Sequence, residues 1–174
     1  MAAQAQISIE EYLHTSYRPD REYVDGEIRE RNVGKWEHAR LQLALGGWFW
    51  NHEAEWRVMG STEQRTRVAQ LRVRIPDLVL VNIESQPDVL VDPPVLIVEI
   101  LSPDDTYSNM RERVADYQEM GVKSIWIIDP QTRTGQMCAG DTWTTARVLT
   151  VPDTRIHVDL DELFSYFGRP AQGA

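Results

Sequence analysis

The stretch Val95-Leu-Ile-Val-Glu-Ile-Leu101 decides the fold, since all but one of its residues are apolar. An apolar run of this length that stops at Ser102-Pro103 is typical of a strand covered on both faces of a sheet. Ser124-Ile-Trp-Ile-Ile-Asp129 is a second run of the same kind. Between the two runs, apolar residues at helical spacing predict a helix over residues 108–120, with Gly121 as its C-cap. Strand, helix and strand together predict a right-handed parallel crossover.

The flanking sequence predicts one mixed sheet flanked by helices, an α/β (α+β) fold with an N-terminal hairpin and short C-terminal strands. Asp25-Gly26, between two short strand-like segments, is a strong hairpin signal. A helix is expected from about residue 36 to residue 52, with a stripe of large side chains facing inward. The stripe comprises His38, Leu41, Leu45, Trp48 and His52. The remaining expected elements are a short helix at 8–13, strands at 56–59, 63–68, 72–81, 134–138, 142–148 and 155–158, and a last helical turn at 159–167.

Composition and charge favour one folded domain and argue against several classes of protein. The 174 residues carry 18 Lys and Arg against 27 Asp and Glu, a net charge of -9, which argues against a general polyanion-binding protein. The single cysteine, Cys138, excludes an internal disulfide and favours a reducing, cytoplasmic setting. No apolar run approaches the ~20 residues of a membrane-spanning helix, and no signal peptide is evident. We expect a single domain over residues 1–174 whose ends, 1–6 and 168–174, fray.

Two carboxylates lie in apolar surroundings, Asp77 in Arg-Ile-Pro-Asp-Leu-Val-Leu-Val and Glu99 in the central run. Burying such a charge costs several kcal/mol unless it is paired, protonated or bound to a cation. Carboxylate oxygens, backbone carbonyls and water are the ligands that Mg²⁺ accepts. Two acids on adjacent strands therefore indicate a divalent-cation site. Spacing alone leaves open a solvated face or an arginine partner for either acid.

Two predicted helices offer further candidates for this site. On the crossover helix, Arg113 is the charged residue nearest the buried face, so it can lean towards Glu99, while Asp116 points further away. The alternative is an ordinary amphipathic arginine whose stem packs on the sheet. Glu37 and His38 begin the other helix and can approach the same place, although packing is the simpler explanation of His38.

These residues resemble the PD-(D/E)xK nuclease superfamily and, within it, the restriction-endonuclease branch often called the Uma family. The matching segments occur in one order and cover almost the whole chain. They are YVDGE at 23–27, EHARLQLAL at 37–45, RIPDLVLV at 74–81, VLIVEILSP at 95–103, RERVADYQEMGV at 111–122 and SIWIIDP at 124–130. The resemblance implies a restriction-endonuclease-like fold and a metal-dependent phosphodiesterase that acts on DNA.

The resemblance also implies roles for individual residues. Asp77 and Glu99 would be metal ligands, with the carbonyl of Ile100 as a third, and the implied cofactor is Mg²⁺, with Mn²⁺ as a substitute. The superfamily's lysine would stand at Leu101, and in this branch it lies on the following helix, at the position of Arg113. Arginine can stabilise charge on a phosphoryl group, but it cannot accept a proton from water.

The first interpretation is therefore the DNA endonuclease, and that departure leaves open an alternative function, a catalytically degenerate nuclease fold that binds DNA or a partner protein. A third interpretation is a metal-binding scaffold without nucleic acid, suggested by the acidic net charge.

The expected partners are DNA and a second copy of the chain. Four alternating arginines on a predicted hairpin are candidate DNA contacts: Arg65, Arg67, Arg72 and Arg74. Their alternative is an ordinary solvated face balanced by nearby acids. Cutting both strands of a duplex is easiest with two active sites, which favours a homodimer. Trp48 and Trp50 lie on opposite faces of the predicted helix, so one of them is a candidate for a subunit interface.

Overall fold

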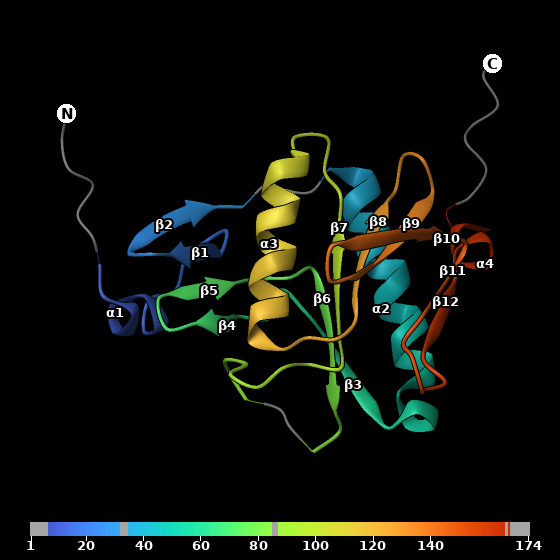
Figure 1. Ribbon diagram of the computed structural model, residues 1–174, viewed down its shortest axis with the longest axis horizontal. Helices are drawn as coiled ribbons and strands as arrows, with labels where there is room; N and C mark the ends of the chain where they lie inside the picture. Colours follow the sequence, from blue (N-terminus) through green and yellow to red (C-terminus); the bar gives the residue numbers. More distant parts are fainter. Residues whose placement is uncertain (1–6, 32–34, 85–86, 166, 168–174) are drawn as a thin grey trace.

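A six-stranded sheet with the order β10-β9-β8-β7-β6-β3 forms the centre of the computed structural model, which describes residues 7–31, 35–84, 87–165 and 167 (Figure 1). The predicted fraying of 1–6 and 168–174 lies outside the described residues. Strands β7 (Leu96–Ile100) and β8 (Ile125–Asp129) run parallel at the centre, and α3 (Tyr107–Met120) connects them. The predicted parallel crossover is therefore confirmed. The other strands of this sheet are antiparallel to their neighbours: β3 (Val58–Thr62), β6 (Leu78–Asn82), β9 (Thr134–Ala139) and β10 (Thr142–Ala146).

The predicted mixed sheet flanked by helices is confirmed, but the predicted hairpin lies outside it, in a separate sheet of four strands with the order β2-β1-β5-β4. The strands of this sheet are β1 (Arg21–Val24), β2 (Glu27–Glu30), β4 (Thr66–Ala69) and β5 (Arg72–Arg74). The strand predicted over 72–81 breaks around Pro76, which has no N–H to donate to a ladder. Consequently β5 and β6 lie in different sheets, and Asp77 stands at their junction.

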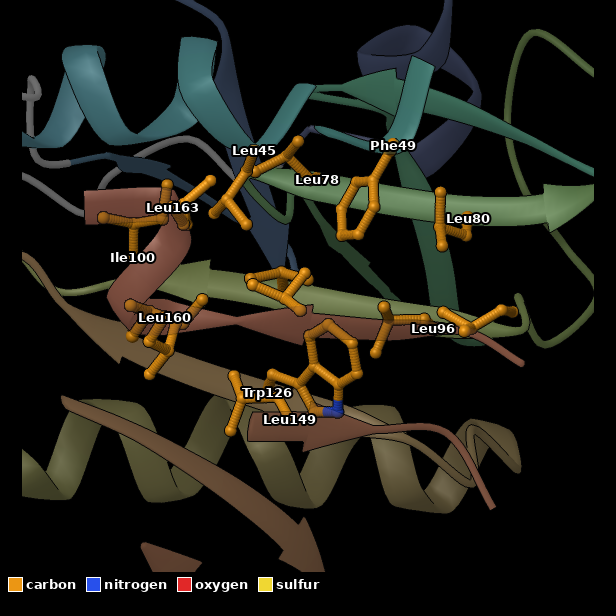
Figure 2. Close-up of a cluster of buried hydrophobic side chains, with 14 of the residues drawn as sticks. Leu45, Phe49, Leu78, Leu80, Leu96, Ile100, Trp126, Leu149, Leu160 and Leu163 are labelled. Atoms are coloured by element: carbon orange, nitrogen blue, oxygen red, sulfur yellow. The ribbon is translucent and has the colours of Figure 1, made fainter. Parts of the chain in front are cut away.

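Two long helices cover opposite faces of the six-stranded sheet. Alternate residues of β7 face opposite sides, so that Leu96, Val98 and Ile100 pack in the cluster that holds α2 (Trp36–Trp56), while Ile97 packs with α3. Figure 2 shows the first cluster, in which α2 side chains meet the sheet and the C-terminal segments. The smaller elements are α1 (Ile9–Leu13), β11 (Val148–Thr150) paired with β12 (His157–Asp159), and α4 (Leu160–Ser165). Among the described residues, no helix is long and apolar enough to cross a membrane.

The inward face of α2 differs from the predicted stripe at its C-terminal half. Its buried residues are His38, Leu41, Leu45 and Phe49. Trp48 and His52 are only half-buried, since β12 rather than the central sheet flanks them. The Trp48 indole N–H donates to the carbonyl of His157 at 2.8 Å.

The crossover helix begins and ends as its sequence predicts. The hydroxyl of Thr106 accepts the Asn109 N–H, and Gly121 ends the helix with φ 102°, a left-handed conformation that favours glycine. The prediction that Asp116 points away from the buried face of the helix is wrong, because its side chain is buried. Its carboxylate is paired with Arg72 and Arg74 from β5, which compensates the buried charge.

Candidate active site

Both predicted acids line one small cavity at the end of β7, between the N-terminal ends of α2 and α3. The cavity has a volume of about 20 Å³, enough for about one species the size of a water molecule. Its lining residues are Arg31, His38, Asp77, Glu99, Ile100, Ser102, Asp105, Met110 and Arg113. Segments distant in the sequence therefore place three carboxylates, two guanidinium groups and one imidazole around one small space.

Three donors surround the buried carboxylate of Asp77. Its Oδ2 accepts the Ile100 N–H at 2.7 Å and lies 3.2 Å from Nε2 of His38. Its Oδ1 accepts a hydrogen bond from Nη2 of Arg31 at 3.1 Å. Burial alone would raise the pKa of Asp77, but His38, Arg31 and the Ile100 amide together hold that pKa below its usual value. Asp77 is therefore a fixed negative charge.

The same contact acts on His38 in the opposite sense. Burial of the imidazole favours its neutral form, but the hydrogen bond to Asp77 and the charge of that carboxylate outweigh burial and raise the pKa of His38. Packing alone therefore does not describe His38, which also holds Asp77. Glu37, the neighbouring candidate, is exposed and does not line the cavity.

Glu99 is a buried acid with a different protonation behaviour. Nη1 of Arg113 lies 3.0 Å from its Oε1, and the Tyr117 hydroxyl donates to the same oxygen. Among the described residues, the hydrogen bonds to Glu99 all converge on Oε1. Burial, strengthened by the nearby charge of Asp77, raises the pKa of Glu99 to about 7, although Arg113 and Tyr117 oppose this shift.

Arg113 bridges Glu99 to a third buried acid, Glu22. Nη2 of Arg113 lies 3.0 Å from Oε1 of Glu22, a residue of β1 in the other sheet. The second carboxylate oxygen of Glu22 pairs with Arg74 at 2.9 Å, and Arg74 also pairs with Asp116. The ion-pair network therefore continues from the cavity into the junction between the two sheets. The pKa of Arg113 is raised well above its usual value, chiefly because Glu99 and Glu22 outweigh the effect of burial.

Sequence reasoning missed three of the residues in this network: Arg31, Glu22 and Tyr117. Tyr117 lies on the buried face of α3 as predicted, but its position did not reveal where its hydroxyl points. Glu22 belongs to the predicted hairpin. Its position next to apolar strand residues that become buried is a signal that could have identified it as a buried acid. Arg31 follows the hairpin in a segment without hydrophobic periodicity, so no pattern marked it.

The four arginines proposed as DNA contacts are not brought together on one exposed face. Arg65 pairs with Asp20 at 2.6 Å, and Arg72 pairs with two acids. Arg74 is only 3% exposed, whereas Arg67 is half-buried and donates to a backbone carbonyl. Ion pairs inside the chain therefore engage three of the four.

Comparisons with known proteins agree on the family and the fold. A family model described as "Uma2: Putative restriction endonuclease" matches residues 9–163. The chain belongs to the Uma2 family. Its fold is similar to a crystal structure titled as a "putative nuclease belonging to DUF820" from Anabaena variabilis ATCC 29413, with a TM-score of 0.79 and 19% sequence identity. That match covers 92% of this chain and 98% of the other. No curated protein matches the chain.

Because the chain belongs to the Uma2 family, we tested whether the residues of the cavity fit a metal ion. Within the described part of the chain, no group of three or more His, Cys, Asp or Glu is arranged to hold a metal ion. The cavity is lined by the carboxylates of Asp77, Glu99 and Asp105, of which Asp105 accepts the Ser102 N–H at 2.7 Å. Because the N–H and C=O of one strand residue point to the same side, the Ile100 carbonyl faces the side of Asp77, where its N–H donates. The carboxylates of Asp77 and Glu99 and the Ile100 carbonyl are oxygen donors that fit a hard cation whose other ligands are water.

The buried charges of this Uma2 protein are already balanced in part by arginines. Arg31 faces Asp77 and Arg113 faces Glu99, so the arginine partners left open by the sequence are present for both acids. The raised pKa of Glu99 indicates that this compensation is incomplete. A cation bound beside Glu99 would supply the missing positive charge.

Proposed function

We propose that this Uma2 protein is a metal-dependent endonuclease that hydrolyses phosphodiester bonds of DNA in the cytoplasm. The observation that carries the proposal is the meeting of Asp77, Glu99 and Arg113 around one cavity, at the positions that the nuclease resemblance assigns to them. The cofactor would be Mg²⁺, which Mn²⁺ can replace, held by Asp77, Glu99 and the Ile100 carbonyl. When bound, such an ion polarises a phosphate oxygen and lowers the pKa of a bound water.

The side chains around the cavity divide the remaining tasks. His38 and the Ile100 amide fix the carboxylate of Asp77, which keeps one oxygen ligand in place. Tyr117 holds Glu99 in the same way. Arg113 keeps its proton and therefore acts as a fixed positive charge that can stabilise a phosphoryl group, not as a general base.

Cleavage of supercoiled plasmid DNA tests this proposal. We expect the wild type to nick the plasmid with Mg²⁺ or Mn²⁺ and to stop when a chelator is added. Asp77→Asn should abolish nicking, whereas Asp88→Asn, which changes an exposed acid outside the cavity, should leave it unchanged. Equal cleavage by the wild type and Asp77→Asn would refute the proposed site.

One observation favours a second candidate, a degenerate nuclease fold that binds DNA without cutting it. Arg113 stands where the family resemblance places lysine, and both terminal nitrogens of its side chain are engaged by buried acids. This candidate predicts salt-sensitive DNA binding by the wild type without cleavage in any divalent metal. Fluorescence anisotropy with a labelled duplex, measured beside the plasmid assay, separates the two functions.

A further inference from the structure

The outward face of α2 carries a stripe of exposed large apolar side chains. Trp36, Leu43 and Trp50 are 81%, 67% and 74% exposed, respectively. They are spaced by seven residues, nearly two full helical turns, and therefore lie on one side of the helix. This side is opposite the face that His38 and Phe49 bury against the sheet. The stripe, with the small residues described below, is called the α2 outer face.

Small residues alternate with the large ones on the α2 outer face: Ala39, Gly46, Gly47 and Ala54. The two glycines are inside the helix, where glycine is less stable than alanine. A Cβ atom built on Gly46 or Gly47 would meet no atom of the described residues within 4 Å, and neither glycine has a positive φ. Within the part of the chain that the structure describes, no neighbour therefore explains the missing side chains.

Hollows flank this glycine pair on both sides of the helix. A cavity of about 560 Å³ is lined by Leu43 and Gly47, with α4 and β12 on its other side. Another, of about 350 Å³, is lined by Gly46 and Trp50, with β3 on its other side. The α2 outer face therefore combines protruding side chains with adjacent depressions.

We propose that the α2 outer face binds a second copy of itself, with the two α2 helices antiparallel around a two-fold axis near Leu45. This register places Trp36 of one copy opposite Ala54 of the other, and Leu43 opposite the Gly46–Gly47 pair. Trp50 then faces Ala39. Each large side chain meets a small residue, and the same pairing repeats on the other side of the axis, as an isologous interface requires. This match of the face to itself identifies the occupant as a second copy.

Charged residues beside the stripe also have partners in this antiparallel register. Lys35 and Glu53 lie on the same edge of the stripe, near its two ends, because eighteen residues make five full turns. An antiparallel pair therefore brings Lys35 of one copy near Glu53 of the other, twice by symmetry. On the opposite edge, Arg40 and Asn51 lie next to the stripe, and Glu37 and Glu55 lie beyond them. Glu37 and Glu55 are also eighteen residues apart, so the same pairing brings these two acids near each other on that edge.

The apolar area is sufficient for a specific interface. Two tryptophans from each copy, at roughly 150–250 Å² each, contribute about 600–1,000 Å². A standard interface buries about 1,600 Å² in total, so the tryptophans alone supply about half of it. Leu43, the alanines and the flanking side chains add to this area.

The proposed pairing does not depend on the proposed nuclease activity, but it determines where the two cavities of a dimer lie. His38 lies near one end of α2, so an antiparallel pair holds its two cavities towards opposite ends of the helix pair. A dimer of this form therefore carries two separate sites.

Sedimentation velocity of the full-length protein tests the interface. We expect the wild type to be a dimer at micromolar concentration, and Trp50→Glu to raise the dissociation constant at least about 30-fold. Val91→Glu, which changes another exposed apolar residue outside this face, should sediment like the wild type. A monomeric wild type, or a dimer that Trp50→Glu leaves unchanged while circular dichroism shows it folded, would overturn the proposal.

Cross-linking tests the register, and it decides the matter if Trp50→Glu does not fold. Gly46 lies near the two-fold axis, so Gly46→Cys should form an interchain disulfide rapidly under mild oxidation. The native Cys138 is buried and should not react. Val91→Cys is the matched control and should remain monomeric on a non-reducing gel. Failure of Gly46→Cys to cross-link would exclude this register and with it the proposed dimer.

Discussion

Nη1 of Arg113 lies 3.0 Å from Oε1 of Glu99, a contact that joins helix α3 to the central strand of the sheet. The same guanidinium reaches Glu22 through its other terminal nitrogen, at 3.0 Å. Arg113 is therefore both a positive charge beside the proposed metal site and a link between the two sheets. These two properties give separate predictions.

Replacing Arg113 by lysine should increase cleavage. Lysine can release its proton in a suitable environment, whereas arginine cannot, so lysine restores the proton chemistry that the resemblance assigns to this position. The rate of plasmid nicking with Mg²⁺ measures the effect. Arg111→Lys, an exposed change on the same helix, is the control. No gain in Arg113→Lys would count against the idea that arginine impairs the chemistry.

Replacing Arg74 by methionine should destabilise the protein strongly. Arg74 compensates Glu22 and Asp116, both of which are buried, and removing one member of a buried ion pair costs about 3–5 kcal/mol. Arg67→Met removes a half-buried arginine with one hydrogen bond to a backbone carbonyl and should cost less than about 1 kcal/mol. Urea unfolding compares the two variants. Similar small losses in both would contradict a structural role for Arg74.

Metal-free stability should depend on pH through Glu99. Its pKa is about 7 in the folded protein, against an ordinary value of 4.5. The folded state therefore keeps a proton that the unfolded chain releases, and this contribution to stability is present below about pH 4.5 and lost as the pH rises through about 7. Glutamine does not titrate, so Glu99→Gln does not lose this contribution. The unfolding free energy of Glu99→Gln relative to that of the wild type should therefore rise between about pH 5 and pH 8, by on the order of 3 kcal/mol at most. A pH-independent difference, measured by urea unfolding with a chelator present, would refute this assignment.

His38 should affect metal binding without being a ligand. His38→Leu removes a donor that holds Asp77, and loss of such a partner typically lowers metal affinity about 10–100-fold. His38→Gln should retain more affinity, because an amide can still donate to the carboxylate. Calorimetric titration with Mn²⁺ measures both variants. Unchanged affinity in His38→Leu would remove His38 from the account of the site.

The central crossover was predictable because local pattern determines it. The apolar run around Glu99 and the capped helix that follows are read directly from residue type and spacing. The separation of β5 from β6 into different sheets was not predictable, because it depends on how the chain passes Pro76, and periodicity does not report a change of sheet.

The candidate site divides in the same way. Asp77 and Glu99 stand out in the sequence as charges among apolar residues, and the position of Arg113 on its helix follows from helical geometry. Arg31 and Glu22 reach the network from segments far apart in the chain, and only the tertiary structure brings them there. The buried Asp116 shows the same limit, since its partners on β5 decide that it can be buried at all.

Calorimetric titration of Mn²⁺ tests the central claim most directly, because it probes the cavity without a DNA substrate. We predict that the wild type binds the ion, that Glu99→Gln loses this binding, and that Glu112→Gln, which changes an acid of α3 outside the cavity, retains it. Wild-type protein that binds no Mn²⁺, or Glu99→Gln that binds as tightly as the wild type, would contradict the assignment of Asp77 and Glu99 as a metal site.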